Sequence, residues 1–145
     1  MREAAVEKFL GIYETSSPSY VLMTGIERCI HYVRDNKETA FAQLRSRLDR
    51  FYQKVSGLSH LKVVRKSDFS ADEAYDFDES KIIIFTKEAM NGHTLLELLL
   101  KKYELQLEMA AGNYVLALAS VMDTDEGFDR LADALIEIDS RLEKL

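Results

Sequence analysis

Apolar residues recur at helical spacing twice in the first half of the chain, and this pattern predicts two long helices. The first stripe lies within residues 18–35 and consists of Leu22, Ile26, Cys29, Ile30 and Val33. The second lies within residues 38–56 and consists of Phe41, Leu44, Leu48, Phe51, Tyr52 and Val55. Between them, Asp35 and Asn36 predict a break and a new helix cap. Residues 3–13 carry a weaker helical pattern.

The second half alternates between strand patterns and helix patterns. Strands are predicted over residues 61–65, 81–86, 105–109 and 114–121, and helices over residues 94–103 and from Asp123 or Thr124 onward. The Ile-Ile-Ile-Phe run within residues 81–86 is typical of a central strand covered on both faces. The final helix has its apolar stripe at Phe128, Leu131, Leu135, Ile138 and Leu142.

This order of elements predicts an α+β fold. Neighbouring strands joined by short turns pair antiparallel. We therefore expect a small, mainly antiparallel sheet with helices packed on one face, preceded by two long helices. The 145 residues suffice for one compact domain, or for one domain with an extension.

Composition narrows the class of partner. The net charge of −6 argues against binding to nucleic acid or to an anionic membrane surface. The apolar runs are too short to span a bilayer. A single cysteine, Cys29, excludes an internal disulfide and fits the reducing cytoplasm. Because Cys29 lies on an apolar stripe, a packed core thiol is favoured over a nucleophile.

Some polar clusters invite a functional interpretation that the sequence does not favour. The acidic stretch 67–80 has no calcium-loop spacing, so a solvated surface loop is favoured over a cation site. The basic stretch that contains Arg45, Arg47, Arg50 and Lys54 is expected to be a solvated face with local ion pairs. His60 and His93 have no metal-binding neighbours in the sequence, and no metal site is predicted.

The most informative stretch is 15–23, which begins with the hydroxyls of Thr15, Ser16 and Ser17 and contains the only proline, Pro18. Ser17 is predicted to cap a helix that starts at Pro18. Hydroxyls and free N–H groups at a helix start also suit a phosphate or an oxyanion. Local physics alone favours the ordinary cap.

This stretch also resembles a known family. Residues 12–23 are similar to the segment that follows the cofactor lysine in bacterial ornithine/lysine/arginine decarboxylases, which are pyridoxal-phosphate (PLP) enzymes of the aspartate-aminotransferase fold. The family form is close to TSSPSYLLMASLD, whereas this chain continues Thr24-Gly25-Ile26-Glu27. A looser resemblance to the family's C-terminal domain follows in order at residues 78–84, Gly92, Leu99, Tyr103, Glu108 and Asp123-Thr124.

The resemblance implies a fragment. Residues 1–36 would be a remnant of the large PLP domain and its connecting helix, and residues 37–145 the small C-terminal domain. The family's cofactor lysine lies upstream of this chain, and neither Lys8 nor Lys81 has its context. We therefore expect no catalytic residue here, no PLP bound to this chain alone and no activity without the missing N-terminal PLP domain.

The resemblance also implies where the chain would meet the cofactor. In the fold family, the loop after the lysine segment reaches the cofactor of the neighbouring subunit. Thr15, Ser16 and Ser17 are thus the candidate cofactor-binding residues, in a homo-oligomer. The main alternative is a stand-alone α+β module for ligand binding or dimerisation. A third is a small enzyme that uses Ser17 or Cys29 with a nearby histidine.

Overall fold

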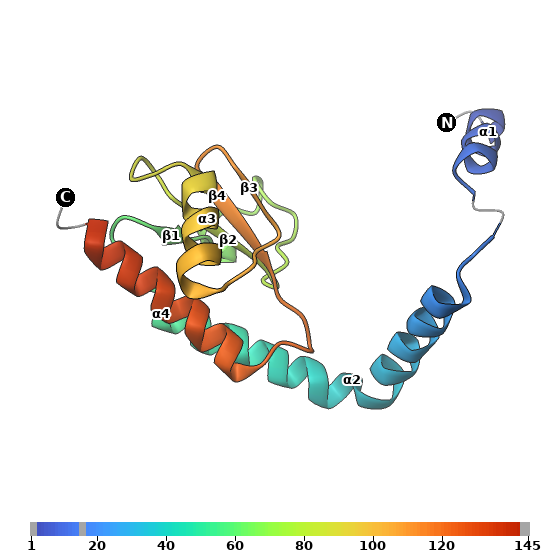
Figure 1. Ribbon diagram of the computed structural model, residues 1–145, viewed down its shortest axis with the longest axis horizontal. Coiled ribbons are helices and arrows are strands. Elements are labelled where there is room, and N and C mark those ends of the chain that lie inside the picture. The colour runs from blue at the N-terminus through green and yellow to red at the C-terminus, as the bar shows by residue number, and fades with distance from the viewer. Residues whose placement is uncertain (1–2, 15–16, 143–145) are drawn as a thin grey trace. The chain divides into compact units, whose positions relative to one another are not determined.

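A computed structural model describes residues 3–14 and 17–142. By its contacts the chain divides into two units, Met1–Glu38 and Thr39–Leu145. The elements, labelled in Figure 1, are α1 (Glu3–Tyr13), α2 (Tyr20–Lys54), β1 (Lys62–Val63), a 3₁₀ turn (Lys66–Asp68), β2 (Lys81–Phe85), α3 (Gly92–Tyr103), β3 (Met109–Ala111), β4 (Tyr114–Leu118) and α4 (Asp125–Leu142). None of the described helices is long and apolar enough to cross a membrane.

The two long helices predicted before the sheet are one continuous helix, α2, so the predicted break at Asp35 and Asn36 is wrong. The side-chain amide of Asn36 donates to the backbone carbonyl of Tyr32 one turn earlier, at 3.0 Å, instead of capping a new helix. Asp35 pairs with the guanidinium of Arg34. With no glycine or proline at this point, nothing forces the backbone out of helical geometry.

The predicted antiparallel sheet is confirmed, with four strands in the order β1-β2-β4-β3. Every neighbouring pair in this sheet is antiparallel. The turn between β3 and β4 uses Gly112, whose φ of 52° suits a residue without a Cβ. Strand β1 is shorter than predicted, and β4 ends at Leu118, before the predicted residue 121.

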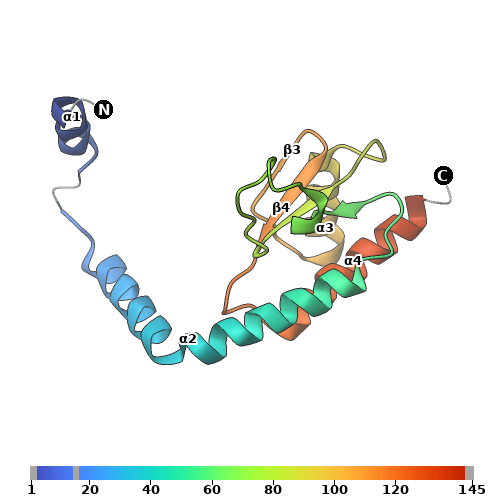
Figure 2. The ribbon, with the colours of Figure 1, turned by 180° about the vertical axis from the view of Figure 1, so that it is seen from behind.

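Helices cover one face of the sheet, as predicted. Ile82 and Ile84 of β2 lie opposite Ala117 and Val115 of β4, and all four side chains are buried. They share one core with apolar residues of α3, α4 and the second half of α2. Figures 1 and 2, which view the molecule from opposite sides, both place α4 alongside the second half of α2.

The prediction that β2 is covered on both faces is wrong. Its alternate residues, Lys81, Ile83 and Phe85, are exposed or only half-buried. An uninterrupted apolar run does not reveal by itself whether a second layer is present. Within the Thr39–Leu145 unit, α3, α4 and the second half of α2 pack against the other face.

The predicted strand over residues 105–109 is also corrected, because β3 begins only at Met109. Leu107 is buried and Glu108 is exposed, so the alternation that suggested a strand is real. The backbone N–H of Glu108 donates to the carbonyl of Leu116, at 2.9 Å. Glu104, which ends α3, has left-handed backbone geometry and turns the chain towards the sheet. Residues 105–107 that follow it form no part of strand β3.

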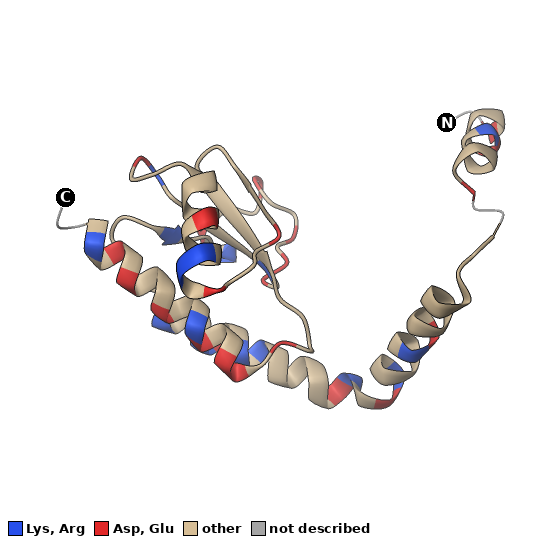
Figure 3. Ribbon diagram, viewed as in Figure 1, with Lys and Arg blue, Asp and Glu red and all other residues tan. Residues whose placement is uncertain are grey.

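Ion pairs join α2 to α4 across their polar faces. Arg47 and Arg50 both pair with Asp125, and Lys54 pairs with Asp129 and Asp133. Figure 3 shows basic and acidic segments along these two helices. Arg45, Arg50 and Lys54 are exposed, as predicted, whereas Arg47 is half-buried. The acidic partners of Arg47, Arg50 and Lys54 lie on α4 rather than nearby in the sequence.

Candidate functional site

The bend between α1 and α2 carries the residues that the sequence singled out. Thr15 and Ser16 lie outside the described residues, and Ser17 is exposed. Helix α2 begins at Tyr20, and the hydroxyl oxygen of Ser19 accepts from the N–H of Leu22, at 3.4 Å. The predicted cap at Ser17 and helix start at Pro18 are therefore wrong. Two serines flank the proline, and either could cap the helix from sequence alone.

This bend offers a partial anion site. The hydroxyl of Ser19 and the first-turn N–H groups of α2 are the donors that a helix start presents. Ser17 lies two residues before the cap and is open to solvent. Donors of this kind can bind an anionic group such as a phosphate.

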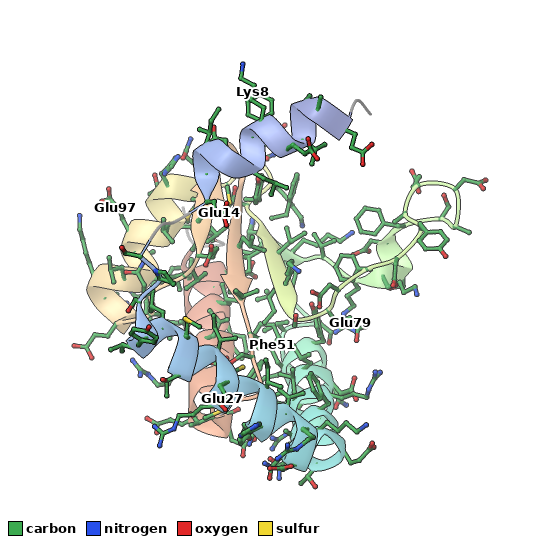
Figure 4. All side chains as sticks on the ribbon, turned by 90° about the vertical axis from the view of Figure 1, so that its right-hand side faces the viewer. Lys8, Glu14, Glu27, Phe51, Glu79 and Glu97 are labelled. Carbon is green, nitrogen blue, oxygen red and sulfur yellow. The ribbon has the colours of Figure 1, made fainter. Side chains whose placement is uncertain are left out.

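Lys8 and Lys81, the two lysines weighed from the sequence, are both exposed. Lys8 lies on α1 with its side chain pointing away from that helix (Figure 4). The Lys81 ammonium lies 2.7 Å from an Asp78 carboxylate oxygen, at the start of a strand. Each is an ordinary exposed cation, so the geometry gives neither a role in covalent chemistry.

The Met1–Glu38 unit has no buried side chain among its described residues. Helix α1 buries none, and in α2 burial begins only at Ala40. Large apolar side chains are strongly exposed instead, including Tyr13 at 82%, Leu22 at 69% and Ile26 at 61%. The predicted stripe is present in the sequence of α2, but its residues Leu22, Ile26, Cys29 and Ile30 are exposed rather than packed within this unit.

Cys29 lies on this uncovered stripe and is exposed, so the prediction of a packed core thiol is wrong. The small-enzyme alternative gains nothing from this exposure. His31 is two residues away on the same helix, and residues at that spacing do not face each other. No hydrogen bond links Cys29 to a histidine in the part of the chain that the structure describes.

The remaining histidines stay unassigned. His60 is half-buried and His93 is exposed. Across residues 3–14 and 17–142, no group of three or more His, Cys, Asp or Glu side chains could hold a metal ion. The acids in the 67–80 stretch support local turns; for example, Glu73 accepts from the backbone N–H and the hydroxyl of Ser70.

Asp139 is an important residue that the sequence analysis missed. Its carboxylate is buried near the end of α4 and accepts from three consecutive backbone N–H groups, those of Ser59, His60 and Leu61, at 2.7–2.9 Å. It thereby holds the connection between α2 and β1 against the last helix. The sequence did offer a signal for this buried carboxylate, because an acid next to Ile138 lies within the apolar stripe of an amphipathic helix.

Comparison with known proteins gives a distant likeness. No family model matches the chain. It is 23% identical over 134 residues to an arginine decarboxylase from Halalkalibacterium halodurans. It is 21% identical, over the same length, to arginine decarboxylases from Bacillus cereus and Bacillus anthracis.

These matches cover 92% of this chain but only 27–29% of the relatives' length. A match of 134 residues leaves at most 11 of the 145 outside it, so the bend and the sheet both fall within the similar region. The chain is thus similar to about a quarter of a decarboxylase.

Proposed function

We propose that this chain is the C-terminal region of a PLP-dependent decarboxylase of basic amino acids such as ornithine, lysine or arginine. In this proposal, residues 1–36 are a remnant of the large domain and its connecting helix, and residues 37–145 form the small domain. The observation that carries it is the similarity to arginine decarboxylases over 92% of the chain and little more than a quarter of their length.

The exposed apolar face of the Met1–Glu38 unit supports the same proposal. A helix gains most of its stability in a protein when its apolar face packs against another surface, and the apolar face of this unit has no such packing within the unit. A missing N-terminal PLP domain would provide that surface. The parent enzyme would be cytoplasmic, since one exposed free thiol suits a reducing compartment.

The residues of this chain would have a supporting role in the reaction. PLP, when bound, supplies the electron sink that allows carbon dioxide to leave an amino acid. Thr15, Ser16 and Ser17 would donate hydrogen bonds to its phosphate across the interface of a homo-oligomer. The lysine and the acid that act on the cofactor would come from the missing domain, so this chain alone would bind no PLP and would be inactive.

The first test is the mass and absorbance of the native protein purified from its source. We expect a polypeptide several times heavier than the 16.6 kDa of this chain, with the visible absorbance of bound PLP. A colourless native protein of 16.6 kDa would contradict the proposal.

The second test addresses the phosphate contacts in that native protein. Replacing Ser16 and Ser17 together by alanine should weaken PLP retention on dialysis. Ser56 and Ser140, which hydrogen-bond within their own helical turns, provide a matched double alanine control. Equal retention in both double variants would show that Ser16 and Ser17 do not help to hold the phosphate.

The alternative, a stand-alone ligand-binding or dimerisation module without catalytic activity, has one observation in its favour. The Thr39–Leu145 unit contains the whole described core, with buried residues from each of its strands except β3. A module with its own core can fold without a partner. Under this alternative, the native protein would have the mass of this chain.

A further inference from the structure

A groove of about 350 Å³ lies at one end of the sheet within the Thr39–Leu145 unit. The segment 105–108, the end of β4 and the first turns of α4 form its walls. Its apolar lining includes the buried side chains of Ile82, Leu107, Phe128 and Leu131. This volume and this lining are typical of a site for a small, partly apolar molecule.

The charged residues that line the groove are all negative. They include two carboxylates, Glu108 and Asp123, and the amide of Gln106. The described residues that line the groove include no lysine, arginine or histidine. A negative site beside buried apolar surface favours a ligand that is both cationic and aliphatic.

The two carboxylates differ in how many of their oxygens are still able to accept a hydrogen bond or pair with a cation. Asp123 uses one oxygen to accept from the backbone N–H of Ser120, at 2.6 Å, and from the Ser120 hydroxyl, at 3.0 Å. Its other oxygen can still accept. The side chain of Glu108 has no ion pair or hydrogen bond with any described residue. Other acids of this unit, such as Asp78 and Asp125, are paired with cations.

We propose that this groove binds a linear aliphatic cation, meaning a primary ammonium or guanidinium group on an unbranched alkyl chain. The alkyl chain packs against the apolar lining, and the cation is held by Glu108 and by the second oxygen of Asp123. A carboxylate on the ligand is disfavoured by both acids. The proposal rests on the groove itself and needs neither PLP nor decarboxylation.

The test is a titration of the ¹⁵N-labelled full chain, followed through its backbone amide signals. The probes are pentylamine and butylguanidine, with pentanol and pentanoate as neutral and anionic controls of similar length. We expect both cations to shift the amides of Gln106, Glu108 and Phe128, with dissociation constants on the order of 1 mM. Pentanol and pentanoate should bind at least about fivefold more weakly, since each lacks the charge that the carboxylates attract.

A variant then measures what the charge of Glu108 contributes to binding. Glu108→Gln keeps the size of the side chain and the backbone bond to Leu116, and it should weaken pentylamine binding about fivefold. Glu88→Gln, at an exposed acid outside the groove lining, is the matched control and should leave binding unchanged.

Three results would overturn the proposal. The first is equal affinity for pentylamine and pentanoate, which would leave an apolar groove without charge selectivity. The second is a set of shifts that avoids the groove. The third is an absence of shifts with either cation, which would fit a groove that another part of a longer protein covers. The comparison among probes uses the unmodified chain, so it does not depend on how a variant folds.

Discussion

Asp139, on α4, accepts three backbone N–H groups of the α2–β1 connection with a single buried carboxylate, so its removal should destabilise that connection. Without it, the N–H groups of Ser59, His60 and Leu61 lose their acceptor in a partly buried place. We expect Asp139→Ala to lower the free energy of unfolding by about 3 kcal/mol, measured by urea denaturation.

Two comparisons make this measurement specific. Asp139→Asn keeps one acceptor oxygen, so it should cost less than the alanine variant. Asp133→Ala, at an exposed partner of Lys54 on the same helix, should change stability by no more than about 0.5 kcal/mol. A loss in Asp139→Ala as small as that of the Asp133 control would contradict the assigned role.

Asp78 should make the free energy of unfolding depend on pH in the acidic range. Its hydrogen bond with the Lys81 ammonium, assisted by Ser80, lowers the pKa of Asp78 from 3.8 to about 2. Because the folded-state pKa is depressed, the stabilisation is fully present above about pH 4 and is lost as the pH falls towards 2. Because the carboxylate is half exposed, this stabilisation amounts to only about 0.5 kcal/mol.

The measurement compares the wild type with Asp78→Asn by urea unfolding between pH 5 and pH 2. The variant should be the less stable protein at pH 5, and the difference should vanish near pH 2. Asp72→Asn, an exposed acid of the same stretch, is the control. A difference that stays constant over this range would show that the ion pair does not act through protonation.

At the scale of elements, the contact between α3 and β4 depends on Gly92. A Cβ built on this residue would overlap the backbone carbonyl oxygen of Tyr114. Gly92→Ala should therefore force the start of α3 away from the strand and cost about 2 kcal/mol of unfolding free energy. Asn91, whose side chain accepts from the N–H of His93 at 2.8 Å, caps this helix start.

Gly127 provides the contrasting case. It lies inside α4, and a Cβ there would be 3.6 Å from the nearest side-chain atom, the hydroxyl oxygen of Thr124. Gly127→Ala should stabilise the protein by about 0.5–1 kcal/mol, because alanine favours the helix and fits the space. Thermal unfolding of the two variants should shift in opposite directions.

Elements with a strong pattern could be predicted from the sequence. In the stripe predicted within residues 38–56, Leu44 to Val55 are buried as predicted, whereas Phe41 is 51% exposed. Leu95 and Leu99 of α3 are buried, and the stripe of α4 is buried from Phe128 to Ile138 but only partly at Leu142. These stripes are long, and a helical period of apolar residues needs a core to face. A short turn explains one of the antiparallel pairs, β3 with β4, whereas β1 with β2 and β2 with β4 are joined by longer connections whose pairing a turn does not decide.

The misses depend on contacts beyond the local sequence. Whether Asn36 caps a helix or continues it is decided by competition between two hydrogen-bonding choices. Whether β2 is covered on one face or two depends on layers that the strand itself does not encode. The groove beside Glu108 combines segments far apart in the sequence, so no local pattern could reveal it. The assignment of Thr15, Ser16 and Ser17 to PLP stays a prediction.

At the scale of the whole molecule, the exposed stripe of the Met1–Glu38 unit should make the isolated chain associate with itself. Apolar surface on this scale is rarely left in water. We expect sedimentation velocity to show a weight-average mass that rises with protein concentration. Leu22→Asp together with Ile26→Asp should reduce this rise, because charge on the stripe opposes its burial.

The matched control adds the same charge to the other side of the helix. Thr24 and His31 lie roughly opposite the stripe at helical spacing, so Thr24→Asp with His31→Asp should leave association largely intact. A wild-type chain that stays monomeric at every concentration would contradict the expectation. So would an equal effect of the two double variants.

The buried carboxylate of Asp139 also bears on how the chain acquires its structure during synthesis. Leu44, Leu48 and Phe51 are made early, yet the helix that supplies much of their covering, with Phe128, Leu131 and Leu135, leaves the ribosome last among the described elements. The acceptor for the 59–61 backbone follows still later. A nascent chain from which Asp139 has not yet emerged therefore exposes an unfinished core, which makes it a target for chaperones until that residue leaves the ribosome.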